Sequence, residues 1–475
     1  MNYYIGIDLG TSSLKGILAD VNGNILRQCS ADYEVRYPKN GWTEQNPSDW
    51  IAALKKVLKT LTRDCSHSVK GLSFGGQMHG LVVLDGSGEV IRPCILWNDG
   101  RTEKQTEYLN AEVGKEKLSG LTGNIAFAGF TAPKLLWLYE NEPDNFARIA
   151  KIMLPKDYLA YVLTGEFATD YSDASGTLLL DVKNKRWSQE MLKICRVSEN
   201  QLPELYDSFS VIGNLKREFA DELGLTSDVK VIIGAGDNAA AAIGTGTVKN
   251  GDCNVSLGTS GTIFISRDGF SVDGANALHS FAHANGKWHL MGCILSAASC
   301  RKWWLEDILA NADYQQDETA ARNADCCGVI FLPYLSGERS PHNDVNAKGA
   351  FIGLSATTSR ADMSRAVMEG VAFALRDCLE VARQNGVVVQ STNLCGGGAK
   401  SETWRQICAD VFGIPVNILT TEQGPAFGAA ILAMVGCGEY PDVLSATEKI
   451  VKVKHTVYPQ ADSVERYEEK YLKFK

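Results

Sequence analysis

A short motif, Leu-Gly-Thr-Ser, occurs twice in this chain, each time between an apolar run and a second run that reads as a strand. The first copy spans residues 9–12 and the second spans residues 257–260, about half of the 475-residue chain apart. A repeat at this distance predicts two related lobes, each presenting one hairpin. A single copy would fit an ordinary hairpin with a polar turn equally well. The second copy favours a pair of turns that face one shared cleft.

The residues of these turns are suited to phosphate groups. Glycine permits a tight turn, and neighbouring hydroxyls and backbone N–H groups then form a concavity for phosphate oxygens. The candidate phosphate-binding residues are Gly10, Thr11 and Ser12 in the first turn and Gly258 and Thr259 in the second. Asp8 precedes the first turn, where its carboxylate could hold Mg²⁺ directly or through water.

The composition predicts an ordinary globular enzyme of two domains. A chain of this length is too long for one hydrophobic core. The net charge of −9 gives no electrostatic footprint for nucleic acid. We expect a cytoplasmic protein, because the start of the chain lacks the features of a signal peptide and no apolar run is long enough to span a membrane. The 13 cysteines form no CxxC pair, and the adjacent Cys326 and Cys327 are poorly placed to share a metal, so we expect structural thiols.

Strand, glycine turn and helix units recur along the chain and predict α/β lobes with functional loops at the strand ends. We place the lobe boundary in a turn-rich segment and expect domains at residues 1–247 and 248–475. The apolar spacing after Pro47 predicts a helix capped by Ser48 or Asp49.

Asp237 is the candidate catalytic residue. It follows a short strand and a Gly-Ala-Gly turn, so its side chain should project into the cleft. Transfer of a phosphoryl group to an alcohol needs a group that accepts the hydroxyl proton, and a carboxylate can do this. The alternative is that Asp237 only caps the alanine-rich helix that follows.

A group of neutral polar, apolar and aromatic side chains in the first lobe suits an uncharged polyhydroxylated ligand. Gln77 and His79 offer neutral hydrogen-bonding groups and Met78 an adaptable apolar surface, although a lone histidine is more often structural. Trp97 offers an aromatic face and Asn98 an amide. The nearby Asp99 and Arg101 could contact the ligand or merely pair with each other.

In the second lobe, Gly396, Gly397 and Gly398 follow a strand and precede a helix. The segment matches neither GxGxxG nor GxxxxGK[ST], which argues against a Rossmann or P-loop site. Three glycines still allow an adenine or phosphate to lie against the backbone near a helix N-terminus. We assign no role to Lys400.

Together these segments resemble the FGGY carbohydrate kinases, and within that family the branch that phosphorylates D-xylulose. The matching motifs run through nearly the whole chain and are Asp8-Leu9-Gly10-Thr11, Gln77-Met78-His79-Gly80, Leu96-Trp97-Asn98-Asp99, Gly236-Asp237-Asn238, Ser256-Leu257-Gly258-Thr259-Ser260-Gly261, Ser336-Gly337-Glu338-Arg339 with Pro341-His342, and Gly396-Gly397-Gly398-Ala399.

The resemblance implies two similar lobes of the actin, hexokinase and Hsp70-like (ribonuclease H-like) ATPase fold around a deep cleft. It also implies ATP-dependent, Mg²⁺-dependent phosphorylation of D-xylulose at its terminal hydroxyl. Asp237 would be the base and Asp8 would serve Mg²⁺. Thr11 and Thr259 would approach the phosphates, and Gly396 and Gly397 the adenosine. The resemblance implies that Met78, His79 and Asn238 line the sugar pocket. With the residues chosen for their chemistry, the full set of sugar-binding candidates is Gln77, Met78, His79, Trp97, Asn98, Asp237 and Asn238.

Two alternatives remain at this point. The first is a kinase of the same family with another acceptor, such as ribulose, fuculose or gluconate. The second is a nucleotide-binding module of the chaperone or filament type, which would lack a sugar pocket beside the base. Kinases of this type are often homodimers, although no stretch of this sequence marks an interface.

Overall fold

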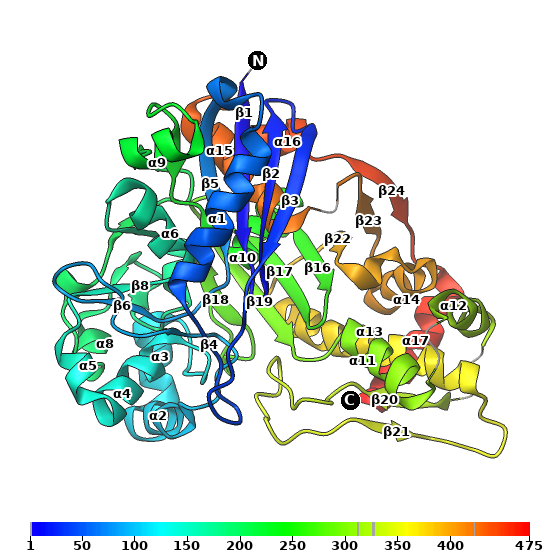
Figure 1. Ribbon diagram of the computed structural model, residues 1–475. Coiled ribbons are helices and arrows are strands. Elements are labelled where there is room, and N and C mark those ends of the chain that lie inside the picture. Colours follow the sequence, from blue (N-terminus) through cyan, green and yellow to red (C-terminus); the bar gives the residue numbers. More distant parts are fainter. Residues whose placement is uncertain (1, 311–312, 325–327, 422) are drawn as a thin grey trace.

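The computed structural model describes residues 2–310, 313–324, 328–421 and 423–475. Two mixed β-sheets form the centres of two lobes, with the N-terminal lobe at the left of Figure 1 and the C-terminal lobe at the right. The first sheet has the order β13-β14-β5-β1-β2-β3, and β15 also pairs with β5. Its strands are β1 (Tyr3–Leu9), β2 (Ser13–Asp20), β3 (Ile25–Asp32), β5 (Val69–Gly76), β13 (Val211–Asn214), β14 (Lys230–Ile232) and β15 (Ala235–Gly236).

The second sheet repeats the pattern of the first, with the order β18-β19-β17-β16-β22-β23-β24. Each sheet contains an antiparallel hairpin, β1–β2 in the first and β16–β17 in the second. The first strand of each hairpin is followed across the sheet by two parallel strands and then by an antiparallel edge strand, in the order β1-β5-β14-β13 and β16-β22-β23-β24. The strands are β16 (Cys253–Leu257), β17 (Gly261–Arg267), β18 (His279–Ala282), β19 (Trp288–Ile294), β22 (Thr392–Cys395), β23 (Val416–Leu419) and β24 (Val453–Val457). The two related lobes predicted from the repeated motif are therefore confirmed.

Helices and short strand pairs surround the two sheets. The helices of the N-terminal half are α1 (Pro47–Thr62), α2 (Glu103–Tyr108), α3 (Lys115–Thr122), α4 (Thr131–Asn141), α5 (Pro143–Ala147), α6 (Pro155–Thr164), α7 (Tyr171–Ser175), α8 (Gln189–Ile194), α9 (Arg217–Leu223) and α10 (Asp237–Gly244). Those of the C-terminal half are α11 (Ala298–Lys302), α12 (Tyr314–Asn323), α13 (Arg360–Gln384), α14 (Glu402–Phe412), α15 (Gly424–Cys437), α16 (Val443–Ile450) and α17 (Ala461–Phe474). The short pairs are β4 (Glu44–Gln45) with β7 (Cys94–Ile95), β6 (Val82–Leu84) with β8 (Lys151–Met153), β9 (Ala168–Asp170) with β12 (Glu204–Tyr206), β10 (Leu180–Asp181) with β11 (Arg186–Trp187), and β20 (Ile330–Leu332) with β21 (Ala350–Ile352).

Helix α15 belongs to the C-terminal half of the sequence but packs on the first sheet. It lies beside β1 and β5 at the top of Figure 1 and also packs along α10. Glycines allow this close approach, because a Cβ at Gly6 would lie 1.9 Å from the Ala426 carbonyl oxygen and one at Gly428 only 1.7 Å from that of Ala240. The two halves of the chain are thus interlocked through backbone contact.

Helices α2 to α5 and α8 form a layer at the lower left of Figure 1, away from the first sheet. Their apolar side chains share one buried cluster with Phe281 of β18 and Met291 of β19. The second sheet therefore also contacts the N-terminal lobe through its β18–β19 edge.

Most element expectations agree with the structure, and the differences are local. Helix α1 is capped at Asn46, not at Ser48 or Asp49, because Pro47 already occupies its first turn. The cysteines among the described residues are all free thiols, and none is exposed. Cys326 and Cys327 lie outside the described residues. No helix in the described ranges is long and apolar enough to cross a membrane.

Candidate functional site

The carboxyl ends of three parallel strands bring the first-lobe candidates together. In the β1–β5 register Leu9 pairs with Gly76, and in the β15–β5 register Gly236 pairs with the same Gly76. The next residue of each strand is Gly10, Gln77 and Asp237, respectively. Three segments that are far apart in the sequence therefore open onto one edge of the sheet, as the strand-end argument predicted.

The Asp237 carboxylate is oriented by its neighbour. Both the backbone N–H and the side-chain amide of Asn238 donate to Asp237 Oδ1, at 2.7 and 2.9 Å. Burial raises the pKa of Asp237 to about 6, against the lowering effect of these two hydrogen bonds. Asp237 is the first residue of α10 and Gly236 is the cap, so the carboxylate does not act as the cap.

Asp8 lies close enough to Asp237 for the charge of Asp237 to affect its pKa. Burial and, to a lesser extent, the charge of Asp237 raise the pKa of Asp8 to about 7, against the lowering effect of Lys15. A divalent cation would offset the unfavourable effect of the Asp237 charge on the ionisation of Asp8. In the described part of the chain no three His, Cys, Asp or Glu side chains gather as a metal site. This donor set suits Mg²⁺, which is commonly bound by one or two carboxylates together with substrate phosphates.

Met78 packs against Gly236, the residue before Asp237, and His79 and Met78 both pack against Gly176. A Cβ at Gly236 would lie 2.9 Å from Met78 Cγ, and one at Gly176 would lie 2.6 Å from the His79 ring, so both glycines are needed for this packing. His79 adopts a left-handed conformation with φ of +69°. Its ring stacks on Phe130 at 4.5 Å, and Nδ1 lies 2.7 Å from the Gly176 carbonyl oxygen.

The contacts of His79 define its protonation. Burial lowers the pKa of His79 to about 3, so the ring is neutral at physiological pH. Because a carbonyl oxygen can only accept, the ring proton lies on Nδ1 and Nε2 carries a lone pair. His79 can therefore accept a hydrogen bond from a ligand hydroxyl.

Lys134 of α4 binds the backbone of His79. The one sequence signal that could have pointed to it is that it is a single lysine in a mostly apolar helix. Its side chain is fully buried, and Nζ donates to the carbonyl oxygens of His79 and Gly129 at 2.8 and 2.7 Å. Thr131 Oγ1 donates to the same His79 carbonyl at 3.1 Å. Burial lowers the pKa of Lys134 to about 7. These bonds hold the unusual backbone conformation of His79 in place.

Gln45, which the sequence analysis did not single out, connects Gln77 to the first turn. Gln77 is buried, and its Nε2 donates to Gln45 Oε1 at 3.0 Å. Gln45 Nε2 donates in turn to the carbonyl oxygen of Thr11. Among the described residues Gln77 Oε1 has no hydrogen-bond partner. Trp97 Nε1 donates to Thr11 Oγ1 at 3.0 Å, so candidates of the sugar and phosphate sites are directly joined.

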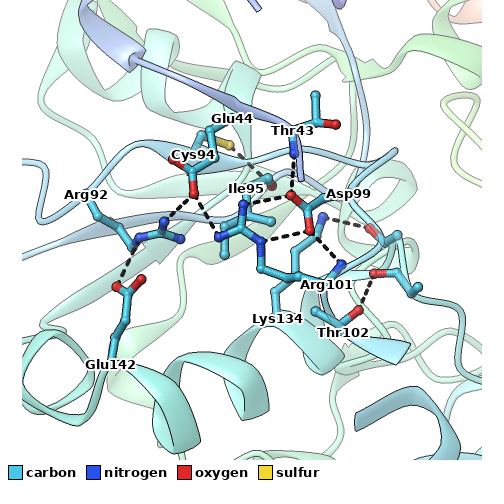
Figure 2. Close-up of polar contacts among 12 residues, drawn as sticks. Thr43, Glu44, Arg92, Cys94, Ile95, Asp99, Arg101, Thr102, Lys134 and Glu142 are labelled. Carbon is cyan, nitrogen blue, oxygen red and sulfur yellow. Dashed lines mark hydrogen bonds and ion pairs between the residues drawn. The ribbon is translucent and has the colours of Figure 1, made fainter. Parts of the chain in front are cut away.

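The loop after Trp97 is held by an ionic network (Figure 2). Arg101 binds both carboxylate oxygens of Asp99, at 2.8 and 2.7 Å, and also pairs with Glu44 at 2.7 Å. Arg92 extends the network from Glu44 to Glu142. Of the two alternatives for Asp99 and Arg101, the structure shows mutual pairing. Asn98 is exposed and makes no hydrogen bond within the described residues.

The second turn and the glycine segment meet in the C-terminal lobe. Gly396 has φ of +88°, and a Cβ there would lie 2.7 Å from the Leu257 carbonyl oxygen and 3.0 Å from Gly258 N. The carbonyl oxygens of Gly258 and Thr259 accept from backbone N–H groups at the start of α11, which fixes the turn. Thr259 and Gly397 are exposed, and a Cβ at Gly397 would meet nothing within 4 Å, whereas Gly398 is packed against Trp404. Open space thus lies beside the turn, as a bound nucleotide requires.

The chain matches known families over most of its length. Residues 3–244 match the N-terminal domain of the FGGY family of carbohydrate kinases, and residues 253–437 match its C-terminal domain. The chain is 41% identical over 479 residues to a xylulose kinase of Lactococcus lactis, covering 99% of this chain and 95% of that protein.

Solved structures agree with these matches. The crystal structure of a "xyloylose kinase" from Brucella ovis has a TM-score of 0.95 at 40% identity and covers 100% of this chain and 98% of that one. The crystal structure of a gluconate kinase from Lactobacillus acidophilus has a TM-score of 0.96 at 29% identity, covering 100% and 96%. The fold expected from the resemblance is thereby confirmed.

Proposed function

The chain belongs to the FGGY family of carbohydrate kinases, and on this premise we propose that it phosphorylates D-xylulose. The γ-phosphate of ATP is transferred to the terminal hydroxyl of the sugar, which gives D-xylulose 5-phosphate. The observation that carries this proposal is the convergence of Asp237, Gln77 and Gly10 at one sheet edge, with Met78 packed against Gly236 and His79 next in the chain. The likeness to the Lactococcus lactis xylulose kinase supports the choice of acceptor.

In this proposal Asp237 is the general base. Asn238 fixes Oδ1, which leaves Oδ2 to take the proton of the sugar hydroxyl as that oxygen attacks phosphorus. With a pKa of about 6 the carboxylate is mostly ionised at neutral pH, yet more basic than an ordinary aspartate. A base whose pKa lies near the working pH is the most effective one.

The sugar pocket combines one fixed acceptor with apolar and aromatic surface. His79 Nε2 accepts from a sugar hydroxyl, and Met78 packs against the carbon chain. Gln77, Trp97, Asn98 and Asn238 are the further candidates on this side. Because Lys134 and Gly176 hold His79 rigidly, little ordering is left to occur when the sugar binds.

The phosphate groups of ATP would be bound by both glycine turns. Thr11 and Ser12 from the first turn and Thr259 from the second approach the phosphates, and Gly396 and Gly397 border the adenosine. Asp8 would hold Mg²⁺ together with phosphate oxygens, and Asp237 lies close enough to share its charge. The cation would neutralise charge on the transferred phosphoryl group.

A coupled ADP-release assay with ATP and Mg²⁺ tests the proposal on D-xylulose, D- and L-ribulose, L-fuculose, glycerol and gluconate. A strong preference for D-xylulose is expected. Preference for gluconate is the main competing outcome, since a gluconate kinase shares this fold so closely. It would keep the base and change the acceptor. Absence of sugar-dependent turnover would reject the proposal.

A further inference from the structure

A loop of the second lobe carries Arg339, which lies near the candidate sugar-binding residues. The loop covers residues 333–349, between β20 and β21, and it is anchored on both sides of Arg339. Glu338 Oε1 accepts from the backbone N–H groups of Arg339 and Leu295, at 2.7 and 2.9 Å. Ser340 N donates to the carbonyl oxygen of Cys293 in β19 at 2.9 Å. The backbone of Arg339 is therefore fixed to the end of a core strand.

The guanidinium of Arg339 differs from those of the two arginines in Figure 2. Arg92 and Arg101 each pair with two carboxylates. Arg339, although half-buried, makes no ion pair and no side-chain hydrogen bond within the described residues. The guanidinium instead lies over the Phe127 ring, whose centroid is 5.4 Å from the guanidinium carbon. Five N–H donors are thus left for a ligand.

The surroundings of Arg339 place it opposite the sugar candidates. Phe127 lies 5.3 Å from Phe130, and Phe130 stacks on His79 at 4.5 Å. Burial lowers the pKa of His79, and the charge of Arg339 contributes to that lowering. Cys293 has its pKa raised by burial and lies within electrostatic reach of both Arg339 and Asp237. Arg339 therefore faces His79 and the Asp237 side of the site from the other lobe.

We propose that Arg339 binds the acceptor sugar from the second lobe, donating hydrogen bonds to its oxygen atoms while Met78 and His79 hold it from the first. The inference rests on the proposed function and adds a binding residue to it. A neutral sugar offers only hydroxyl and carbonyl oxygens as acceptors, and a planar guanidinium can bind two of them together. The phosphates are assigned to the two turns, whereas Arg339 adjoins the aromatic residues around His79.

The test compares Arg339→Met with the wild type in steady-state kinetics and in calorimetric titration with D-xylulose. The KM and Kd for D-xylulose should rise about 10- to 100-fold, as expected when a charged donor loses its hydrogen bonds. The KM for ATP should change less than about twofold, because the phosphates are bound elsewhere. Lys348→Met removes an exposed cation from the same loop and should leave every constant unchanged.

Arg339→Lys serves as the second variant, with its folding checked by thermal denaturation. It keeps the charge but loses the planar fork, so an intermediate KM for the sugar is expected, and this variant decides the matter if Arg339→Met does not fold. Sugar-dependent turnover in the wild type that both variants leave unchanged would overturn the inference alone. A wild type without sugar-dependent turnover would reject the proposed function, and the inference with it.

Discussion

At the scale of single residues, the environment assigns different charge states to groups of the same type. Asp8 and Asp237 have their pKa values raised by burial, and His79 is held neutral. Asp99, by contrast, forms an ion pair with Arg101 within the loop network. A carboxylate without a cationic partner at a strand end is therefore the group available for chemistry.

Replacing Asp237 by asparagine should abolish turnover while binding persists. Asparagine keeps the shape and the Oδ1 acceptor for Asn238 but cannot take a proton. We expect kcat to fall about 10²- to 10⁴-fold. Calorimetry should show that ATP and D-xylulose still bind with nearly wild-type affinity. Turnover close to the wild-type rate in this variant would contradict the role of Asp237 as base.

The rate should depend on pH through the same carboxyl group. Because the ionised form is the active one and its pKa is about 6, kcat/KM for the sugar should rise with pH through about 6 and level off above it. His79 should cause no change in rate with pH near neutrality, since its pKa is lowered to about 3. The measurement is a profile of kcat/KM from about pH 5 to about pH 9. A flat profile across the acid half of that range would contradict the assignment.

At the scale of elements, the active carboxylate depends on how two helices pack. Asp237 begins α10, and α10 lies against α15 with backbone almost in contact at Gly428 and Ala240. Because a carbonyl oxygen cannot rotate away as a side chain can, any atom added at this crossing must separate the helices. Separation would move Asp237 relative to β5 and Met78.

Gly428→Ala should therefore lower both stability and activity. Its Cβ would lie 1.7 Å from the Ala240 carbonyl oxygen, and overpacking of this kind costs about 1–3 kcal/mol or more. The melting temperature and kcat should both decrease. Gly120→Ala in α3 is the matched helical control, since nothing lies within 4 Å of its Cβ. It should be neutral or stabilise by up to about 1 kcal/mol. Equal melting temperatures for the two variants would argue against the close packing of α10 and α15.

At the scale of the whole molecule, the lobes are joined on both sides of the site. On one side α10 and α15 interlock. On the other, Asn124 exchanges hydrogen bonds of 2.9 and 3.1 Å with the backbone of Ser280, and Trp288 Nε1 donates to the Val182 carbonyl oxygen at 2.9 Å. Motion between the lobes must preserve these contacts, so it should occur in the outer part of the C-terminal lobe. The division at residues 247 and 248 and the homodimer expected from the resemblance stay predictions.

Sugar and nucleotide together should make the molecule more compact. The proposed phosphate turns lie on different lobes, and closure around both substrates would exclude water from the transferred phosphoryl group. Small-angle scattering should show a smaller radius of gyration with saturating D-xylulose and a non-hydrolysable nucleotide analogue than with either alone. An unchanged radius of gyration would count against closure.

The two-lobed fold could be predicted from the sequence alone, whereas the roles of the site residues stay predictions. The repeated Leu-Gly-Thr-Ser motif predicted the two related lobes, and the strand and glycine-turn units predicted functional loops at the strand ends, where Gly10, Gln77 and Asp237 follow neighbouring strands. These inferences succeed because period and turn chemistry are local properties, which neighbouring residues specify.

The contacts that support those residues could not be predicted from the sequence, because they depend on tertiary packing. Lys134 under His79, Gln45 between Gln77 and Thr11, the pairing of Arg101 with Glu44 and the position of Arg339 beside Phe127 all arise from packing between segments distant in the sequence. The same holds for α15, which packs on the sheet of the other lobe. A lysine, a glutamine or an arginine looks the same in the sequence whether it is solvated or buried. Its role follows from which carbonyl, carboxylate or ring the fold brings to it.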